Sequence, residues 1–169
     1  MNKKVLISLI LVIVWMGVIF YFSSMESAES QGKSVGIVKD VIHEVDKITN
    51  ASEETIKKHE SIEFLESANY YFRRCSHAFV YFVLSILVVN FLLQLHKYSL
   101  LKCNILSIIF CFLYACTDEF HQTFVNGRTG QFLDTLVDSL GAVLGSLIIS
   151  FVYKLIMKNK NNSQKMSKI

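Results

Sequence analysis

Ionisable side chains lie beside the apolar stretches of this chain at helical spacing. His77 and Tyr81 are four residues apart, as are Asp134 and Asp138, so each pair would share one face of an α-helix. Histidines near carboxylates suit general acid/base catalysis. Arginine offers a planar, bidentate fork to phosphate or carboxylate. These residue types predict a site that either performs acid/base chemistry or holds an anion.

Candidate roles follow from the same residue types. Acid/base or histidine-orienting roles fall to His77, Asp118, Glu119 and His121. Ligand-binding roles fall to Ser23, Ser24, Arg73, Arg74, Tyr81, Gln122, Arg128, Asp134 and Asp138. A structural network of ion pairs between helix ends is the alternative for the charged members. The sequence contains no HExxH or CxxC pattern, so neither a metal nor a cofactor is expected.

Composition indicates the kind of element that must position these residues. Of 169 residues, 52% are hydrophobic and 18% are charged, whereas soluble domains carry about 25% charged residues. The mean hydropathy is +0.41. These values favour an integral membrane protein, and a net charge of +3 is too small to indicate a nucleic-acid partner.

Four apolar stretches predict membrane spans at about 5–22, 75–95, 103–122 and 132–153. The third is apolar only as far as Thr117, so it must include Asp118 to Gln122 to cross about 30 Å of hydrocarbon. The expected fold is an all-α integral membrane four-helix bundle, forming one domain over residues 1–169. Gly141 and Gly145 would pack the fourth span closely against a neighbour.

The segment between the first two spans, residues 23–74, is too long for a turn. Apolar residues at helical spacing predict two amphipathic helices lying over the bundle. These residues are Val38, Val41, Ile42, Val45 and Ile48, and then Ile62, Leu65 and Phe72. The series Asn50 to Glu53 resembles a helix start.

Basic residues near the span ends predict the orientation. Lysines but no acidic residues flank the spans on the side of both termini, including the tail 154–169. Both termini are therefore expected in the cytoplasm and residues 23–74 outside. The candidate site residues would then meet at the outer membrane boundary. Arg73, Arg74 and Arg128, the only arginines in the chain, lie on that side too.

Three blocks of sequence resemble the VanZ-like membrane proteins. The first is Phe22-Ser23-Ser24, the second runs from Arg73 to Tyr81, and the third runs from Tyr114 to Gln122 with Arg128, Asp134 and Asp138 after it. Two positions depart from the family pattern. The family more often has Lys where this chain has Arg74 and Pro where it has Asn126.

The resemblance implies a multi-pass protein of the bacterial cell membrane that contributes to low-level resistance to teicoplanin-type glycopeptides. The expected partners are a membrane lipid or a lipid-linked cell-wall precursor, and the lipoglycopeptide drug is an alternative ligand. Two further functions stay open. One is a hydrolase or transferase acting on a lipid-linked or phosphate-bearing substrate. The other is a transporter or structural partner protein, and a homo-oligomer is compatible with each.

Overall fold

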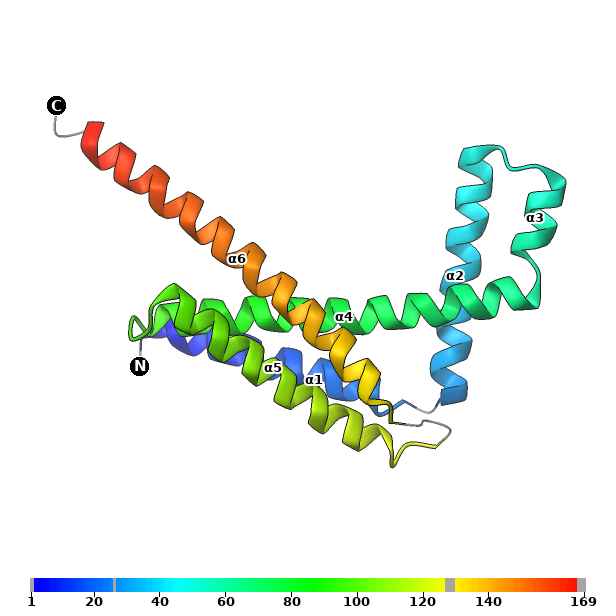
Figure 1. The fold of residues 1–169 in the computed structure, drawn as a ribbon, viewed down its shortest axis with the longest axis horizontal. Coiled ribbons are helices and arrows are strands. Elements are labelled where there is room, and N and C mark those ends of the chain that lie inside the picture. The colour runs from blue at the N-terminus through cyan, green and yellow to red at the C-terminus, as the bar shows by residue number, and fades with distance from the viewer. Residues whose placement is uncertain (1, 26, 127–129, 167–169) are drawn as a thin grey trace.

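The chain forms six α-helices in the part that the computed structural model describes, residues 2–25, 27–126 and 130–166. Side chains are not described for residues 27–31, 161, 162 and 164–166. The helices are α1 (Lys3–Ser23), α2 (Ser27–Thr49), α3 (Glu53–His59), α4 (Ile62–Gln94), α5 (Leu100–Gln122) and α6 (Phe132–Met166) (Figure 1). These residues include no strand.

Four of these helices are long and apolar enough to cross a membrane. They are α1, α4, α5 and the Phe132–Lys160 part of α6. The prediction of an all-α protein with four membrane-spanning helices is therefore confirmed. The third span does include its polar last turn, because α5 continues without a break to Gln122.

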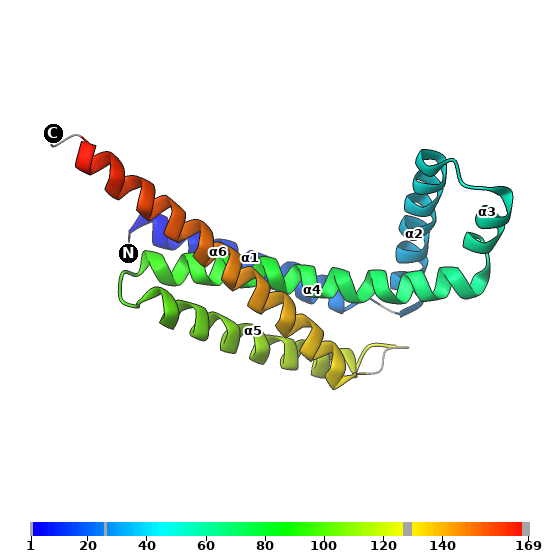
Figure 2. The ribbon, with the colours of Figure 1, turned by 45° about the horizontal axis from the view of Figure 1, so that its top comes forward.

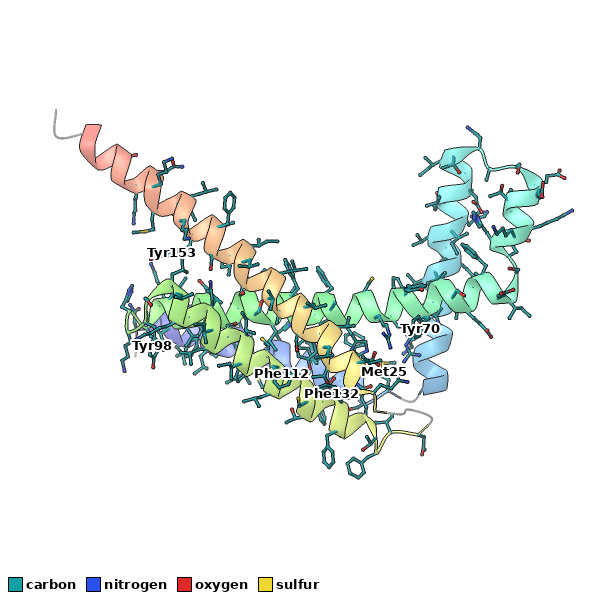
Figure 3. All side chains as sticks on the ribbon, in the orientation of Figure 1. Met25, Tyr70, Tyr98, Phe112, Phe132 and Tyr153 are labelled. Carbon is teal, nitrogen blue, oxygen red and sulfur yellow. The ribbon has the colours of Figure 1, made fainter. Side chains whose placement is uncertain are left out.

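The four spans pack at different inclinations. Figures 1 and 2 show α1 and α5 inclined less steeply to α4 than α6, which crosses α4 obliquely and whose last turns leave the bundle. The start of α1 and the end of α6 lie toward the same end of the molecule. Met25 and Phe132 lie toward the opposite end from Tyr98 (Figure 3). That opposite end is called the polar end below.

The interior of the bundle combines larger apolar residues such as Leu84 with many small side chains. The small buried residues include Ser85, Ser107, Cys111, Ala142 and Ser146, whereas many large apolar residues of all four spans are exposed. Apolar side chains gain nothing by leaving lipid, so membrane helices associate through close packing and interhelical hydrogen bonds. The Ser107 hydroxyl, for example, donates to the Ser85 carbonyl at 3.1 Å and joins α5 to α4.

Gly141 and Gly145 lie where α6 touches α4. A Cβ atom at Gly141 would overlap the backbone carbonyl of Ala78, and one at Gly145 would overlap the carbonyl of Phe82 and the hydroxyl of Ser85. The sequence prediction that this pair allows close helix packing agrees with these contacts. Only glycine fits at either position without moving the helices apart.

The segment between the first two spans differs from the expectation of two helices over the bundle. α2 crosses α4 steeply (Figures 1 and 2), and α3 begins after its N-cap residue Ser52. The second amphipathic stretch, however, is the beginning of α4, which starts after Ser61 and runs unbroken to Gln94. No glycine or proline interrupts residues 62–94, so nothing stops the helix at the membrane boundary.

Candidate functional site

The candidate residues sit at the polar end because α1 and α5 finish there and α6 begins there. Ser23 is the last residue of α1, Gln122 is the last of α5, and Asp134 lies in the first turn of α6. α4 passes through this level without ending and carries Arg73 to Tyr81. The structure divides the candidates into a buried group, a group that ties helices together and a group around a cavity.

The buried group, called the acidic site below, consists of Tyr81, Asp118, Gln122 and Asp138. Tyr81 is fully buried, and Asp118 and Asp138 are 4% and 2% exposed. The hydroxyl of Tyr81 interacts electrostatically with both aspartates, and Asp138 also interacts with Asp118. Side chains from α4, α5 and α6 therefore meet in one place inside the bundle.

Oxygen atoms of the acidic site lack hydrogen-bond partners among the described residues. The Gln122 amide donates to Oδ2 of Asp118 at 3.1 Å, but Oδ1 of Asp118, Oδ1 of Asp138 and the Tyr81 hydroxyl have none. Leaving buried polar groups unsatisfied is costly, and two buried carboxylates repel each other. The arrangement is suited to hold a proton, a cation or the donor groups of a ligand.

Two other candidates tie α1 to α5. The Ser24 hydroxyl donates to the carbonyl of Phe20 at 2.7 Å and lies 3.2 Å from Nε2 of His121. The His121 ring also stacks on Phe20 with a centroid separation of 4.6 Å. Among the described residues, the Ser24 hydroxyl lies within hydrogen-bond range of His121, and that Asp118 or Glu119 orients this histidine stays a prediction.

Glu119 holds the connection between α5 and α6. Its Oε1 atom accepts a hydrogen bond from the backbone N–H of Gln131, just before the first turn of α6. The side chain is 9% exposed. This contact gives Glu119 a role in positioning α6, whatever else it does.

Arg74 and Asp134 join α4 to α6 at the edge of the polar end. Nη2 of Arg74 lies 2.9 Å from Oδ1 of Asp134, and the guanidinium also lies over the Tyr70 ring, 4.6 Å from its centroid. The contact is an ion pair without hydrogen-bond alignment, since Oδ1 has no partner in hydrogen-bond geometry among the described residues. The contact is of the kind that the structural alternative describes, an ion pair between two helices.

The remaining candidates surround a cavity of about 300 Å³ between α1, α2 and α4, called the basic pocket below. Its polar lining residues are Ser23, Lys33, Ser34, Arg73, Ser76 and His77. Sequence reasoning found Ser23, Arg73 and His77 but missed the other three. The sequence did contain a signal for Ser34. This residue lies four positions before Val38, the first residue of the predicted amphipathic stripe, and both residues are buried.

Arg128, the last candidate, lies outside the described residues. The described residues contain no group of three or more His, Cys, Asp or Glu side chains that could hold a metal ion. All four cysteines are free.

Comparison with known proteins identifies a family for the chain but no individual relative. No curated protein and no solved structure matches the chain. The sequence model of the VanZ/LLP1 family matches residues 8–153, a range that includes most of the first and fourth spans, all of the second and third, the acidic site and the basic pocket. The chain thus belongs to the VanZ/LLP1 family.

Proposed function

We propose that this protein lowers the susceptibility of a bacterial cell to teicoplanin-type glycopeptides and that the acidic site is required for this. Membership of the VanZ/LLP1 family supports an association with glycopeptide resistance. The observation that carries the site assignment is the convergence of Tyr81, Asp118 and Asp138 from three spans with unpaired, buried oxygen atoms. Ionisable residues inside a membrane bundle are expensive and mark functional sites by default.

We also propose an orientation of the protein in the membrane. Both termini lie in the cytoplasm and the polar end lies at the outer leaflet of the bacterial cell membrane, where an acyl-tailed glycopeptide acts. The excess of lysine beside the ends that carry the termini supports this orientation. The partner at the polar end is a membrane lipid, a lipid-linked cell-wall precursor or the drug itself.

The test is expression of the wild type, Asp138→Asn and Tyr81→Phe in a susceptible Gram-positive host. The minimal inhibitory concentrations of an acyl-tailed glycopeptide and of one without the tail are then measured. The Asp138→Asn change keeps the shape of the side chain but replaces its carboxyl group by an amide. We expect the increase given by the wild type to be lost at equal membrane abundance.

Ser139→Ala is the matched control, because the Ser139 hydroxyl donates only to the Thr135 carbonyl of its own helix. It should keep the wild-type phenotype. Retention of the phenotype by both Asp138→Asn and Tyr81→Phe would refute the site. Loss that follows membrane abundance would assign these residues to folding alone.

A second candidate function, a hydrolase or transferase acting on a phosphate-bearing envelope substrate, has one observation in its favour. Asp118 and Asp138 are both buried and interact electrostatically, and paired carboxylates can divide acid and base roles. Purified Asp138→Asn separates the two candidates. An enzyme would convert a phosphate-bearing envelope lipid and lose that turnover in Asp138→Asn, whereas a binding protein would leave the lipid unchanged in both the wild type and the variant.

A further inference from the structure

The basic pocket lies on the opposite side of α4 from the contact with α6 and has its own chemistry. It is bounded by the end of α1, the first half of α2 and the part of α4 around Arg73. Arg73 and Lys33 bring positive charge to it, and His77 adds a ring nitrogen. Two basic side chains in one cavity favour an anionic ligand.

Ser23 gives the pocket a fixed polar atom. The residue is 1% exposed and lines the pocket, and its Oγ atom has no hydrogen-bond partner among the described residues. The neighbouring hydroxyls differ, because Ser24 and Ser76 donate to carbonyls of their own helices, Phe20 and Phe72. A ligand oxygen would satisfy the buried Ser23 hydroxyl, whose unpaired state is otherwise unfavourable.

The rest of the pocket wall is apolar. Ile19 and Phe22 of α1 and Val80 of α4 contribute to it. Large apolar residues of α1 and α4 are also exposed, including Phe20 and Phe79. A volume of about 300 Å³ is at the lower end of the range for small-molecule sites. It suits a headgroup but not a whole lipid, so an attached hydrocarbon chain would lie along the bundle surface.

Phosphate matches the polar part of this site. Arginine and lysine both bind phosphate, arginine through two parallel hydrogen bonds, and a serine hydroxyl can donate a third. We propose that the basic pocket binds a phosphate group carried on an apolar chain, with the phosphate between Arg73, Lys33 and Ser23 and the chain against α1 and α4. The inference rests on the proposed function, because it names the ligand class at the same end of the bundle.

The test uses the full-length protein in phosphatidylcholine nanodiscs, and binding is measured by native mass spectrometry. The probes are dioleoyl phosphatidate, farnesyl phosphate, dioleoylglycerol and inorganic phosphate. We expect at least one of the two phosphorylated lipids to bind at least ten times more tightly than dioleoylglycerol and inorganic phosphate. The tighter of the two identifies the chain type, glycerolipid or prenyl.

Variants locate the site. Arg73→Gln should weaken binding of the phosphorylated lipid about tenfold, the size expected for a lost charged hydrogen bond. Lys33→Gln should weaken it less, because lysine acts as a single point charge. Lys39→Gln is the matched control, since it removes the same charge from the same helix but lines a different cavity, beside α3. It should bind within twofold of the wild type.

A second variant tests the pocket without removing a charge. Ser76→Phe adds an aromatic ring to the cavity and should also weaken binding. Three results would overturn the proposal: equal binding of dioleoylglycerol, equal binding of inorganic phosphate, or equal loss in Arg73→Gln and Lys39→Gln. No drug is present in this assay. Normal lipid binding by a wild type that confers no drug tolerance would refute the proposed function alone.

Discussion

Gly141→Ala adds one methyl group at the place where α6 crosses α4, and we expect it to separate the two helices. The new Cβ atom would lie 3.0 Å from Cα of Ala78 and closer still to its carbonyl oxygen. Carbon atoms in good contact are about 3.5–4.0 Å apart. Both colliding atoms belong to the backbone and cannot rotate away, so α6 must move outward by on the order of 1 Å.

The cost of that movement follows from what it disrupts. Overpacking a tight interface costs about 1–3 kcal/mol. For a chain of this length each kcal/mol lowers the melting temperature by roughly 2–4 °C. Gly145→Ala meets the carbonyl of Phe82 on the same interface and should cost a similar amount. The double variant should cost less than the sum, because one displacement of α6 relieves both contacts.

Thermal unfolding of the purified protein in detergent, followed by circular dichroism, measures these effects. Gly17→Ala is the matched control, since a Cβ atom at Gly17 meets nothing within 4 Å and alanine is the better helix former by up to about 1 kcal/mol. It should be as stable as the wild type or slightly more stable. Equal melting temperatures for Gly141→Ala and Gly17→Ala would refute the close contact between α6 and α4.

Three other measurements test further contacts and the orientation. A double-mutant cycle with Arg74→Gln and Asp134→Asn should give a coupling of at most about 1 kcal/mol, because the pair is partly exposed. The coupling should shrink in high salt, and a salt-independent value would contradict the ion pair. Trp15→Phe keeps a ring but loses the bond to the α4 backbone, so it should cost about 1 kcal/mol in thermal unfolding. In a cysteine-free background, an impermeant thiol reagent should label Lys57→Cys in intact cells and Lys160→Cys only after permeabilisation. The reverse pattern would overturn the orientation.

The four spans could be predicted because uncharged stretches of this length have few alternatives to crossing a membrane. The start of α4 could not be predicted in the same way. A hydropathy pattern locates the part of a helix that lies in lipid, whereas the helix itself begins where a side chain caps it. Ser61 supplies that cap by accepting from the N–H of Phe64, so α4 extends well beyond the apolar stretch.

The candidate residues could be found by type, but their partners could not. Adjacent residues on a helix point about 100° apart, and this is enough to send Arg73 to the basic pocket and Arg74 to Asp134. Which arginine goes where depends on the rotation of α4 against α1, α2 and α6. The sequence does not encode that rotation locally. For the same reason His121, one turn after Asp118, contacts α1 while Asp118 faces the interior.

The path of α4 through the polar end connects the two sites physically. His77 lines the basic pocket, Ala78 touches Gly141, and Tyr81 belongs to the acidic site. These three residues occupy little more than one helical turn, so a movement of α4 would reach both sites, whereas a movement of α6 would reach the acidic site alone. A displacement of α6 at Gly141 moves Asp138, one turn earlier on the same helix, away from Tyr81. The pocket, formed by α1, α2 and α4, is not on that path. Gly141→Ala should therefore disturb the acidic site while leaving lipid binding at Arg73 intact.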